Sequence, residues 1–245
     1  MQELQKRVQR DSIYSHTHDL IENFRFDKEV VGVFEDMISR SVPGYGMVLS
    51  LVGVLAETYL QEQSRGYDLG TSLGGATLAM RKIAEERGCE LVAVDNSTAM
   101  VEQCRKSFST GYPVELRCED LRDTTVENAS LVIMNFTLQF IPLAEREAIL
   151  HKIATGINAG GAFMLSEKIN FNDPEQQQRI NNLHHSFKRA NGYSEMEISQ
   201  KRSALEDVLV SETVERHIER LHKVGFNRVQ VIFQALNFVS ILALR

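Results

Sequence analysis

Short apolar runs alternate with amphipathic segments of helical length between residues 65 and 168, and this alternation restricts the chain to few folds. Strands are predicted over residues 65–70, 90–95, 113–118, 130–135 and 161–168, and helices over residues 75–86, 97–108 and 143–155. Strands and helices that alternate at this spacing are typical of βαβ units in a mostly parallel, doubly wound sheet. The sequence therefore predicts an α/β protein with a Rossmann-like fold.

The segments on either side of this pattern add detail to the predicted fold. Two apolar N-terminal helices are expected over residues 27–41 and 47–60, and residues 1–25 are polar and predict a loosely held arm. Residues 26–245 would then form a single domain. Residues 173–224 show two or three amphipathic helices and no strand, which predicts a helical insertion. Two last strands, 229–235 and 238–244, predict a terminal antiparallel hairpin, which is typical of S-adenosylmethionine methyltransferase folds.

Composition and charge exclude several classes of protein. With 245 residues, 43% of them hydrophobic and 24% charged, the chain can bury one sizeable core. It has no apolar run long enough for a membrane span and no leader-like apolar segment, so a cytoplasmic protein is expected. The three cysteines lack a C-x-x-C pair and the seven histidines lack ligand spacing, so neither disulfides nor a metal site are predicted. A net charge of −6 disfavours direct binding to nucleic acid.

The turn after the first predicted strand is rich in small residues and reads D-x-G-x-S-x-G from Asp68 to Gly74. Glycines allow the backbone to turn tightly and to approach a ligand, so Gly70, Thr71 and Ser72 are candidate ligand contacts. A dinucleotide site needs a glycine where Ser72 stands, and Asp68 would repel a phosphate. The acidic residue suits a cation, such as the amino-acid moiety of S-adenosylmethionine, although a plain strand-to-helix turn would read the same way.

Polar residues also follow the second and third predicted strands, at the edge where ligands of open α/β sheets bind. Asp95, with Asn96 beside it, lies twenty-one residues after Gly74. At this spacing a carboxylate accepts both ribose hydroxyls, although Asp95 could instead cap the next helix. Asp120 and Leu121 could bind the adenine amino group and flank its ring, or they could form a surface turn.

The fourth predicted strand ends in the string NFTLQF at residues 135–140. An N-P-P-Y motif at this place would indicate amino-group methylation, and the string lacks it. Asn135 is expected to contact the bound cofactor. Phe136, Leu138 and Phe140 are expected to pack in the core rather than around a substrate.

The predicted helical insertion concentrates four cations in an acidic protein: Lys188, Arg189, Lys201 and Arg202. Such a run is usually a solvated helix face. Its functional interpretation is an anion site, in which an arginine binds a carboxylate with two hydrogen bonds. The adjacent histidines His184 and His185 are interpreted as structural.

Several strings are specific enough to indicate a family: SVPGY at 41–45, DLGTSLG at 68–74, VDNS at 94–97, NFTLQF at 135–140, LSEK at 165–168, FKRANGYSE at 187–195 and ISQKR at 198–202. Over about residues 25–245 the chain resembles the bacterial carboxy-S-adenosylmethionine synthase family. The resemblance implies a homodimeric transferase that converts S-adenosyl-L-methionine and prephenate into carboxy-S-adenosyl-L-methionine and phenylpyruvate without a metal. It also implies that the product passes to a tRNA carboxymethyltransferase, which modifies the wobble uridine, so this chain need not contact tRNA.

The family's binding pattern falls on Tyr45, Gly70, Thr71, Ser72, Asp95, Asn96, Asp120, Leu121, Asn135 and Arg202. The resemblance implies two catalytic residues: Tyr45 orients the reacting methyl group, and Arg202 reaches across the dimer to the added carboxylate. It leaves open whether Lys168, Arg189 or Lys201 holds the carboxylates of prephenate. The alternative functions are an ordinary small-molecule methyltransferase with the same loops and a noncatalytic module that binds S-adenosylmethionine.

Overall fold

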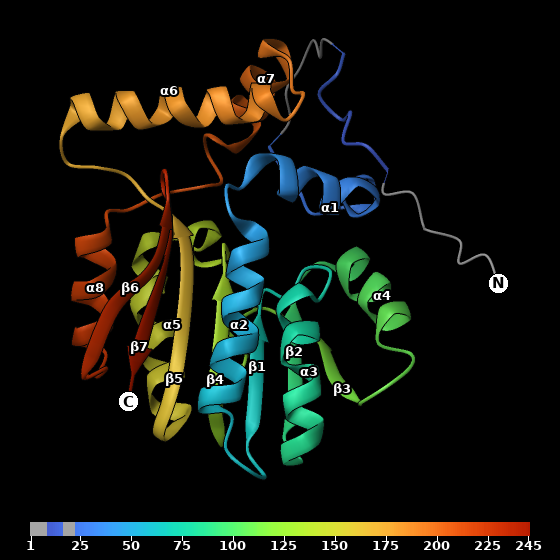
Figure 1. Cartoon of the computed structure of the whole chain (residues 1–245), viewed down its shortest axis with the longest axis vertical. Helices are drawn as coiled ribbons and strands as arrows, with labels where there is room; N and C mark the ends of the chain where they lie inside the picture. The colour runs from blue at the N-terminus through green and yellow to red at the C-terminus, as the bar shows by residue number, and fades with distance from the viewer. Residues whose placement is uncertain (1–8, 17–22) are drawn as a thin grey trace.

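A seven-stranded sheet forms the centre of the molecule, in the order β3-β2-β1-β4-β5-β7-β6 (Figure 1). The computed structural model describes residues 9–16 and 23–245. The strands are β1 Arg65–Leu69, β2 Glu90–Asp95, β3 Val114–Cys118, β4 Ala129–Asn135, β5 Ile157–Lys168, β6 Arg228–Ala235 and β7 Phe238–Leu244. Strand β7 pairs antiparallel with β5 and β6, whereas β1 to β5 pair parallel with their neighbours. The predicted mostly parallel sheet with a terminal hairpin is confirmed.

The helices lie close to the positions that the apolar spacing predicts. They are α1 Lys28–Ser41, α2 Tyr45–Tyr59, α3 Gly75–Arg87, α4 Thr98–Ser107, α5 Leu143–Gly156, α6 Pro174–Ala190, α7 Glu195–Leu205 and α8 Val214–Lys223, with a short 3-10 helix, η1, at Leu138–Phe140. The side chains of Asp27, Ser97 and Asp173 accept backbone N–H bonds at the starts of α1, α4 and α6. Such caps satisfy N–H groups that have no partner inside the helix, so they fix where each helix begins.

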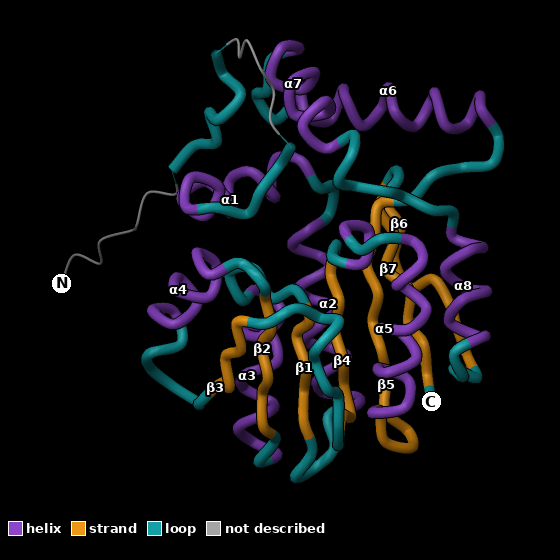
Figure 2. The backbone as a smooth tube through the Cα atoms, turned by 180° about the vertical axis from the view of Figure 1, so that it is seen from behind, coloured by secondary structure: helices purple, strands orange, loops and turns teal. Residues whose placement is uncertain are grey.

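Helices cover both faces of the sheet. Helices α2 and α3 lie on one face, where Val52 and Met80 are fully buried against the strands. Helices α5 and α8 lie on the other face, where Leu150 and Leu221 are buried (Figure 2). Helices α1, α6 and α7 instead lie beyond the carboxyl ends of the parallel strands. They therefore face the edge of the sheet at which ligands of this architecture bind.

The predicted helical insertion consists of α6, α7 and α8, and these helices differ in their surroundings. Helix α8 packs against β6, in the manner of an ordinary crossover helix. Helices α6 and α7 contact each other and α6 contacts α1, away from the faces of the sheet. The insertion that distinguishes this chain is therefore the pair α6 and α7.

Part of the predicted N-terminal arm is anchored rather than loosely held. Asp11 is only 2% exposed, its carboxylate accepts a hydrogen bond from the Tyr193 hydroxyl, and it lies 3.7 Å from Nζ of Lys201. Its backbone N–H donates to Asp36 in α1. The polar sequence predicted a loosely held arm because the residues that bind Asp11, in α1 and after α6, are far away in the sequence. Residues 1–8 and 17–22 of the predicted arm lie outside the described residues.

Within residues 9–16 and 23–245, no single helix is long and apolar enough to cross a membrane. Helices α1 and α2 reach that length and composition only when taken together, and they are bent by 96° where they meet.

Candidate functional site

A cavity of about 380 Å³ lies between the carboxyl ends of the strands and the helices α1, α6 and α7. This volume falls in the usual range of ligand pockets, roughly 300–1,000 Å³. Nine of the ten residues that the sequence predicts as binding residues line it: Tyr45, Gly70, Thr71, Ser72, Asp95, Asn96, Asp120, Leu121 and Asn135. Arg202 is the exception, since its side chain is exposed and does not line the cavity of its own chain. We call the side formed by the loops after β1, β2, β3 and β4 the floor of the cavity.

The turn after β1 has the geometry that its glycines predict. Gly70 has φ +79°, and a Cβ added to it would lie 2.2 Å from Oγ1 of Thr137, so no larger residue fits without movement. Ser72 follows with φ +52°, in the left-handed region that residues other than glycine rarely adopt. This backbone brings the Ser72 N–H within 2.8 Å of the Asp95 carboxylate, which joins the two loops of the predicted nucleoside site.

The side chain of Asp68 stabilises this turn through hydrogen bonds. Its Oδ2 accepts hydrogen bonds from Oγ1 of Thr71 and from both N and Oγ1 of Thr77, at 2.7 to 2.9 Å. Burial raises the pKa of the Asp68 carboxyl, and these hydrogen bonds oppose that rise. Its Oδ1 accepts no bond from the described part of the chain, and Asp68 lines the cavity. The residue can therefore hold the turn and still face a cation.

Asp95 combines the two roles that the sequence left open. Its Oδ1 accepts from the Ser97 N–H at 2.9 Å, while Ser97 itself caps α4 by accepting from the Met100 N–H. Burial raises the pKa of Asp95, and the N–H groups of Ser97 and Ser72 counteract that rise. A carboxylate fixed by two backbone donors and facing a cavity keeps lone pairs free to accept hydroxyl groups. Its position thus suits a ribose.

Asp120 and Leu121 form the part of the floor that follows β3. Arg122 binds the Asp120 carboxylate with two parallel bonds, from Nε at 2.9 Å and from a terminal nitrogen at 2.8 Å. These bonds lower the pKa of Asp120 and keep the carboxylate in place. Leu121 is buried beside it and lines the same cavity, so a polar and an apolar contact are offered next to each other.

Asn135, at the end of β4, is the residue that most directly indicates where a ligand would bind. Both polar atoms of its side chain are buried and find no hydrogen-bond partner within residues 9–16 and 23–245, although the residue lines the cavity. Leaving such atoms unpaired costs about 1–3 kcal/mol each, so they are normally satisfied. A ligand with both donors and acceptors, such as the amino-acid part of S-adenosylmethionine, would satisfy them.

Two aromatic side chains of the string NFTLQF line the cavity together with Asn135. This differs in part from the prediction that Phe136, Leu138 and Phe140 all pack in the core. Leu138 is a core residue as expected, but Phe136 and Phe140 line the cavity. Phe136 has φ +56° and its ring lies 6.3 Å from that of Tyr45. Because this left-handed backbone turns Phe136 back over the strand end, the alternating pattern of a strand no longer predicts which side it faces.

Tyr45 is the first residue of α2, and its hydroxyl lies 3.1 Å from where a Cβ on Gly75 would stand. Burial raises its pKa well above the ordinary range of a tyrosine, and the charge of Asp68 adds to the rise. The hydroxyl therefore remains protonated and can donate a hydrogen bond into the cavity.

Two buried residues that the sequence did not single out position the loop after β4. Glu167 is 1% exposed and accepts from the Leu138 N–H at 3.0 Å, and burial raises its pKa to about 8. Gln139 accepts from the Lys168 N–H at 3.0 Å. Neither has a sequence signal beyond its place in the strings LSEK and NFTLQF, because their roles depend on β5 lying beside β4.

The opposite side of the cavity, which we call the roof, is cationic. Lys168 at the end of β5, Lys188 on α6 and Lys201 on α7 all line it, together with Ser41 and His184. Lys201 has partners, Asp11 at 3.7 Å and Ser41 at 3.3 Å. Arg189 instead points away, to Glu195 at 2.6 Å. Of the cations that the sequence left as candidates for binding carboxylates, Lys168 and Lys201 thus face the cavity and Arg189 does not.

His184 has a structural position, as interpreted from the sequence. Its Nε2 lies 2.8 Å from the backbone oxygen of Ser41, and its ring packs edge-on against Phe238 at 5.0 Å. Burial and the charge of Lys188 lower its pKa to about 3, so the ring is neutral. It ties α6 to the end of α1 and adds no charge to the roof. Among the described residues, no group of three or more His, Cys, Asp or Glu side chains could hold a metal ion.

Curated relatives match nearly the whole chain. A carboxy-S-adenosyl-L-methionine synthase of Trichlorobacter lovleyi is 54% identical over 240 residues, which cover 96% of this chain and 98% of that protein. Synthases of the same name from Yersinia enterocolitica and Hahella chejuensis are 49% and 50% identical, over 97% and 96% of this chain and 90% and 98% of those proteins. The profile of the family described as "Methyltransferase domain" matches residues 67–161.

Solved structures show the same fold at low identity. Human N-acetylserotonin methyltransferase in complex with S-adenosylmethionine is 16% identical with a TM-score of 0.60, and the match covers 89% of this chain and 55% of that chain. A putative S-adenosyl-L-methionine-dependent methyltransferase from Methanococcus maripaludis is 16% identical with a TM-score of 0.59, over 93% and 97% of the two chains. The predicted methyltransferase-type Rossmann-like fold is confirmed.

Proposed function

The chain belongs to the carboxy-S-adenosyl-L-methionine synthase family, and on this premise we propose that it converts S-adenosyl-L-methionine and prephenate into carboxy-S-adenosyl-L-methionine and phenylpyruvate. The observation that carries the proposal is one cavity with a carboxylate-rich floor and a cationic roof. The floor suits the ribose and the cationic groups of S-adenosylmethionine. The roof suits an anionic second substrate, which a site built only for a neutral methyl acceptor would not need.

The proposed reaction needs little acid–base chemistry from the chain. Prephenate loses its ring carboxylate as carbon dioxide and expels hydroxide as the ring becomes aromatic. The methyl group of the sulfonium gives up one proton, its carbon bonds to the carbon dioxide, and the proton and hydroxide leave as water. The chain contributes proximity, exclusion of water and hydrogen bonds that fix the substrates. Tyr45, with a protonated hydroxyl and its ring against Phe136, is placed to orient the methyl group.

We further propose that Arg202 acts in the cavity of a second copy of the chain. Its side chain is exposed and outside the lining of its own cavity. Burial and then the charge of Arg202 nevertheless lower the pKa of Lys168, and the pKa of His185 is lowered by burial, by the charge of Lys188 and by that of Arg202. Arg202 therefore lies near the mouth of the cavity without entering it. An arginine in this position can reach a carboxylate in a neighbouring subunit, and the product would then contact both copies.

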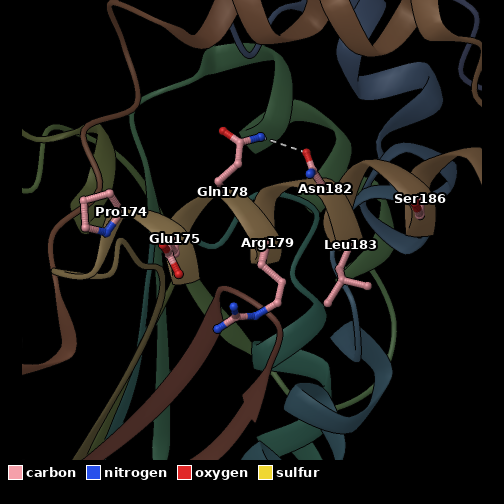
Figure 3. A pocket seen from close by; sticks show the side chains of 7 residues that line it. All are labelled: Pro174, Glu175, Gln178, Arg179, Asn182, Leu183 and Ser186. Carbon is pink, nitrogen blue, oxygen red and sulfur yellow. Dashed lines mark hydrogen bonds between the residues drawn. The ribbon is translucent and has the colours of Figure 1, made fainter.

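The outer face of α6 is the proposed contact between the two copies. Arg179 and Leu183 project from one side of the helix, and the 48% exposed Leu183 is one of the larger apolar side chains on the surface (Figure 3). They border a hollow along this helix together with Pro174, Glu175, Gln178, Asn182 and Ser186. Leu183→Glu should give monomers in analytical ultracentrifugation, while Leu143→Glu, at another exposed leucine, should leave dimers. A dimeric Leu183→Glu variant would place the interface elsewhere.

The product is a carboxymethyl donor, so its consumer must be a carboxymethyltransferase, and we propose the enzyme that modifies the tRNA wobble uridine. The net charge of −6 supports transfer of the small molecule rather than binding of tRNA by this chain.

Mass spectrometry of the small molecules formed by the purified protein tests the proposed function. Incubation with S-adenosylmethionine and prephenate should give a species heavier than S-adenosylmethionine by one carbon dioxide, and omission of prephenate should abolish it. Formation of S-adenosylhomocysteine with some methyl acceptor would support an ordinary methyltransferase. Tight binding without any turnover would support a noncatalytic module.

A further inference from the structure

Two of the three lysines in the roof have no counter-ion among the described residues. The ammonium groups of Lys168 and Lys188 make no ion pair and no side-chain hydrogen bond with residues 9–16 and 23–245, although both line the cavity and are partly buried. Lys201, in the same roof, is held by Asp11 and Ser41. The described part of the chain thus supplies an anion for Lys201 and none for the other two lysines.

The two lysines reach the cavity from different elements. Lys168 is the last residue of β5, beside β4, and its neighbour in the register of β5 and β7 is Phe238. In the pairing of β4 and β5, Asn135 lies opposite Ser166, so Lys168 lies just beyond the end of β4. Lys188 lies in the last turn of α6, above the sheet edge. A ligand bound to both lysines would lie in the same cavity as Asn135, which is expected to contact S-adenosylmethionine.

The lysines of the roof repel one another and are partly buried, so their charged forms are disfavoured. Burial, with the charges of Lys201 and Lys168, lowers the pKa of Lys188 to about 7. Burial and the charge of Arg202 lower the pKa of Lys168. His184 is neutral, so it adds no positive charge to those of the lysines. Like charges gathered in a cavity are disfavoured, and a bound anion would compensate them.

We infer that Lys168 and Lys188 together bind the carboxylates of the second substrate, which is a small dicarboxylate. This inference rests on the proposed function for the identity of that substrate as prephenate. Two separate cations match two carboxylates, while Asp68 on the other side of the cavity suits the amino group of S-adenosylmethionine and Asp95 suits its ribose. The arrangement places the carboxylate donor above the methyl group and keeps the two substrates in fixed order across the cavity.

Methionine variants test the inference, because methionine keeps the length of the side chain and removes the charge. Lys168→Met and Lys188→Met should each raise KM for prephenate by about 30-fold or more, the effect of losing one partner of an enclosed charge pair. KM for S-adenosylmethionine should change by less than about twofold. Lys106→Met, at an exposed lysine on α4, is the matched control and should change neither value.

A second readout separates binding of substrate from support of the fold. If the lysines serve an anion, each methionine variant should melt at the same or a higher temperature than the wild type without ligand, because an uncompensated charge has been removed. A structural role predicts a lower melting temperature. The corresponding arginine variants restore the cation and should recover part of the affinity for prephenate.

Direct binding keeps this test independent of turnover. Prephenate is titrated calorimetrically into wild-type protein and into both variants, each loaded with S-adenosylhomocysteine, which cannot react. Weaker binding to both variants supports the inference even if the wild type forms no carboxy-S-adenosyl-L-methionine, an outcome that would refute the proposed function alone. Equal affinities in wild type and variants, or no binding to the wild type, would overturn the inference.

Discussion

The floor and the roof of the cavity satisfy their charges in opposite ways. On the floor, Asp68, Asp95 and Asp120 each accept several hydrogen bonds from the chain itself. In the roof, Lys168 and Lys188 have no such partners among the described residues. The floor is therefore held in place by contacts within the chain, whereas we expect a bound anion to complete the roof.

A buried ion-pair network joins the floor to the segment between α7 and α8. Arg146 on α5 is fully buried and donates to the backbone oxygens of Gln139 and Ile141, at the floor, and of Val210, which precedes α8. It also binds Glu212 at 2.7 Å, and Glu212 accepts two bonds from Arg220. We therefore expect this network to hold the segment after α7 in position against the loop after β4.

The largest expected effect is on stability, at this junction. Arg146→Met removes one of the two arginines that pair with Glu212, together with the hydrogen bonds that Arg146 donates to three backbone oxygens, and should lower the free energy of unfolding by about 3–5 kcal/mol. Lys223→Met, which removes an exposed pair with Glu147 between the same two helices, should cost less than about 1 kcal/mol. Urea denaturation measures both. Similar costs for the two variants would show that the buried network stabilises the chain no more than an exposed ion pair does.

The same junction should respond to acid. Burial alone would raise the pKa of Glu212, but hydrogen bonds from Arg220 and Arg146 lower it to about 2. Since the folded-state pKa lies below the ordinary 4.5, the stability that this carboxylate contributes is present above pH 4.5 and is lost as the pH falls towards 2. The difference in unfolding free energy between wild type and Glu212→Gln should shrink over this range, from on the order of 3 kcal/mol. A difference that is independent of pH would contradict the assignment.

A smaller effect is expected from the floor. Gly70→Ala places a Cβ 2.2 Å from Thr137 in a left-handed backbone, and should weaken S-adenosylmethionine binding by about 10- to 100-fold. Gly88→Ala is the control, because Gly88 also has a positive φ but a Cβ there meets nothing within 4 Å. Calorimetric titration should show near wild-type affinity for Gly88→Ala. An unchanged affinity in Gly70→Ala would mean that the floor is less rigid than described.

The smallest effect is expected at Tyr45. Tyr45→Phe keeps the ring against Phe136 and removes only the hydroxyl, so kcat should fall by about 5- to 10-fold, the value of one hydrogen bond. Affinity for S-adenosylmethionine should stay within about twofold. Steady-state kinetics separates the two quantities, and a loss confined to affinity would assign Tyr45 to binding rather than to the reacting methyl group.

The floor could be predicted from the sequence because its signals are local. Gly70 follows β1 and Asp95 ends β2, and the apolar runs of both strands are short and regular. Parallel strands bring their carboxyl ends together. Nothing in those signals depends on a contact between distant segments. The helix starts were predictable for the same reason, as at Asp27 and Ser97, which cap the helices that immediately follow them.

The roof could be predicted only in part. Lys188 and Arg189 are neighbours in sequence, yet one lines the cavity and the other pairs with Glu195 outside it, and only the packing of α6 decides which is which. Asp11 gave no signal at all, because its partners, Lys201 and Tyr193, lie more than 180 residues away in the chain. Contacts between distant segments, rather than local pattern, determine this side of the site.

Transfer of an isotopic label tests the central claim that one cavity brings a carboxylate donor to S-adenosylmethionine. Prephenate labelled with carbon-13 in its ring carboxylate would be incubated with the protein and unlabelled S-adenosylmethionine in unlabelled bicarbonate buffer. We expect the heavy carbon in carboxy-S-adenosyl-L-methionine and none of it in phenylpyruvate. An unlabelled product, or release of all the label as free carbon dioxide with S-adenosylmethionine unchanged, would contradict the account.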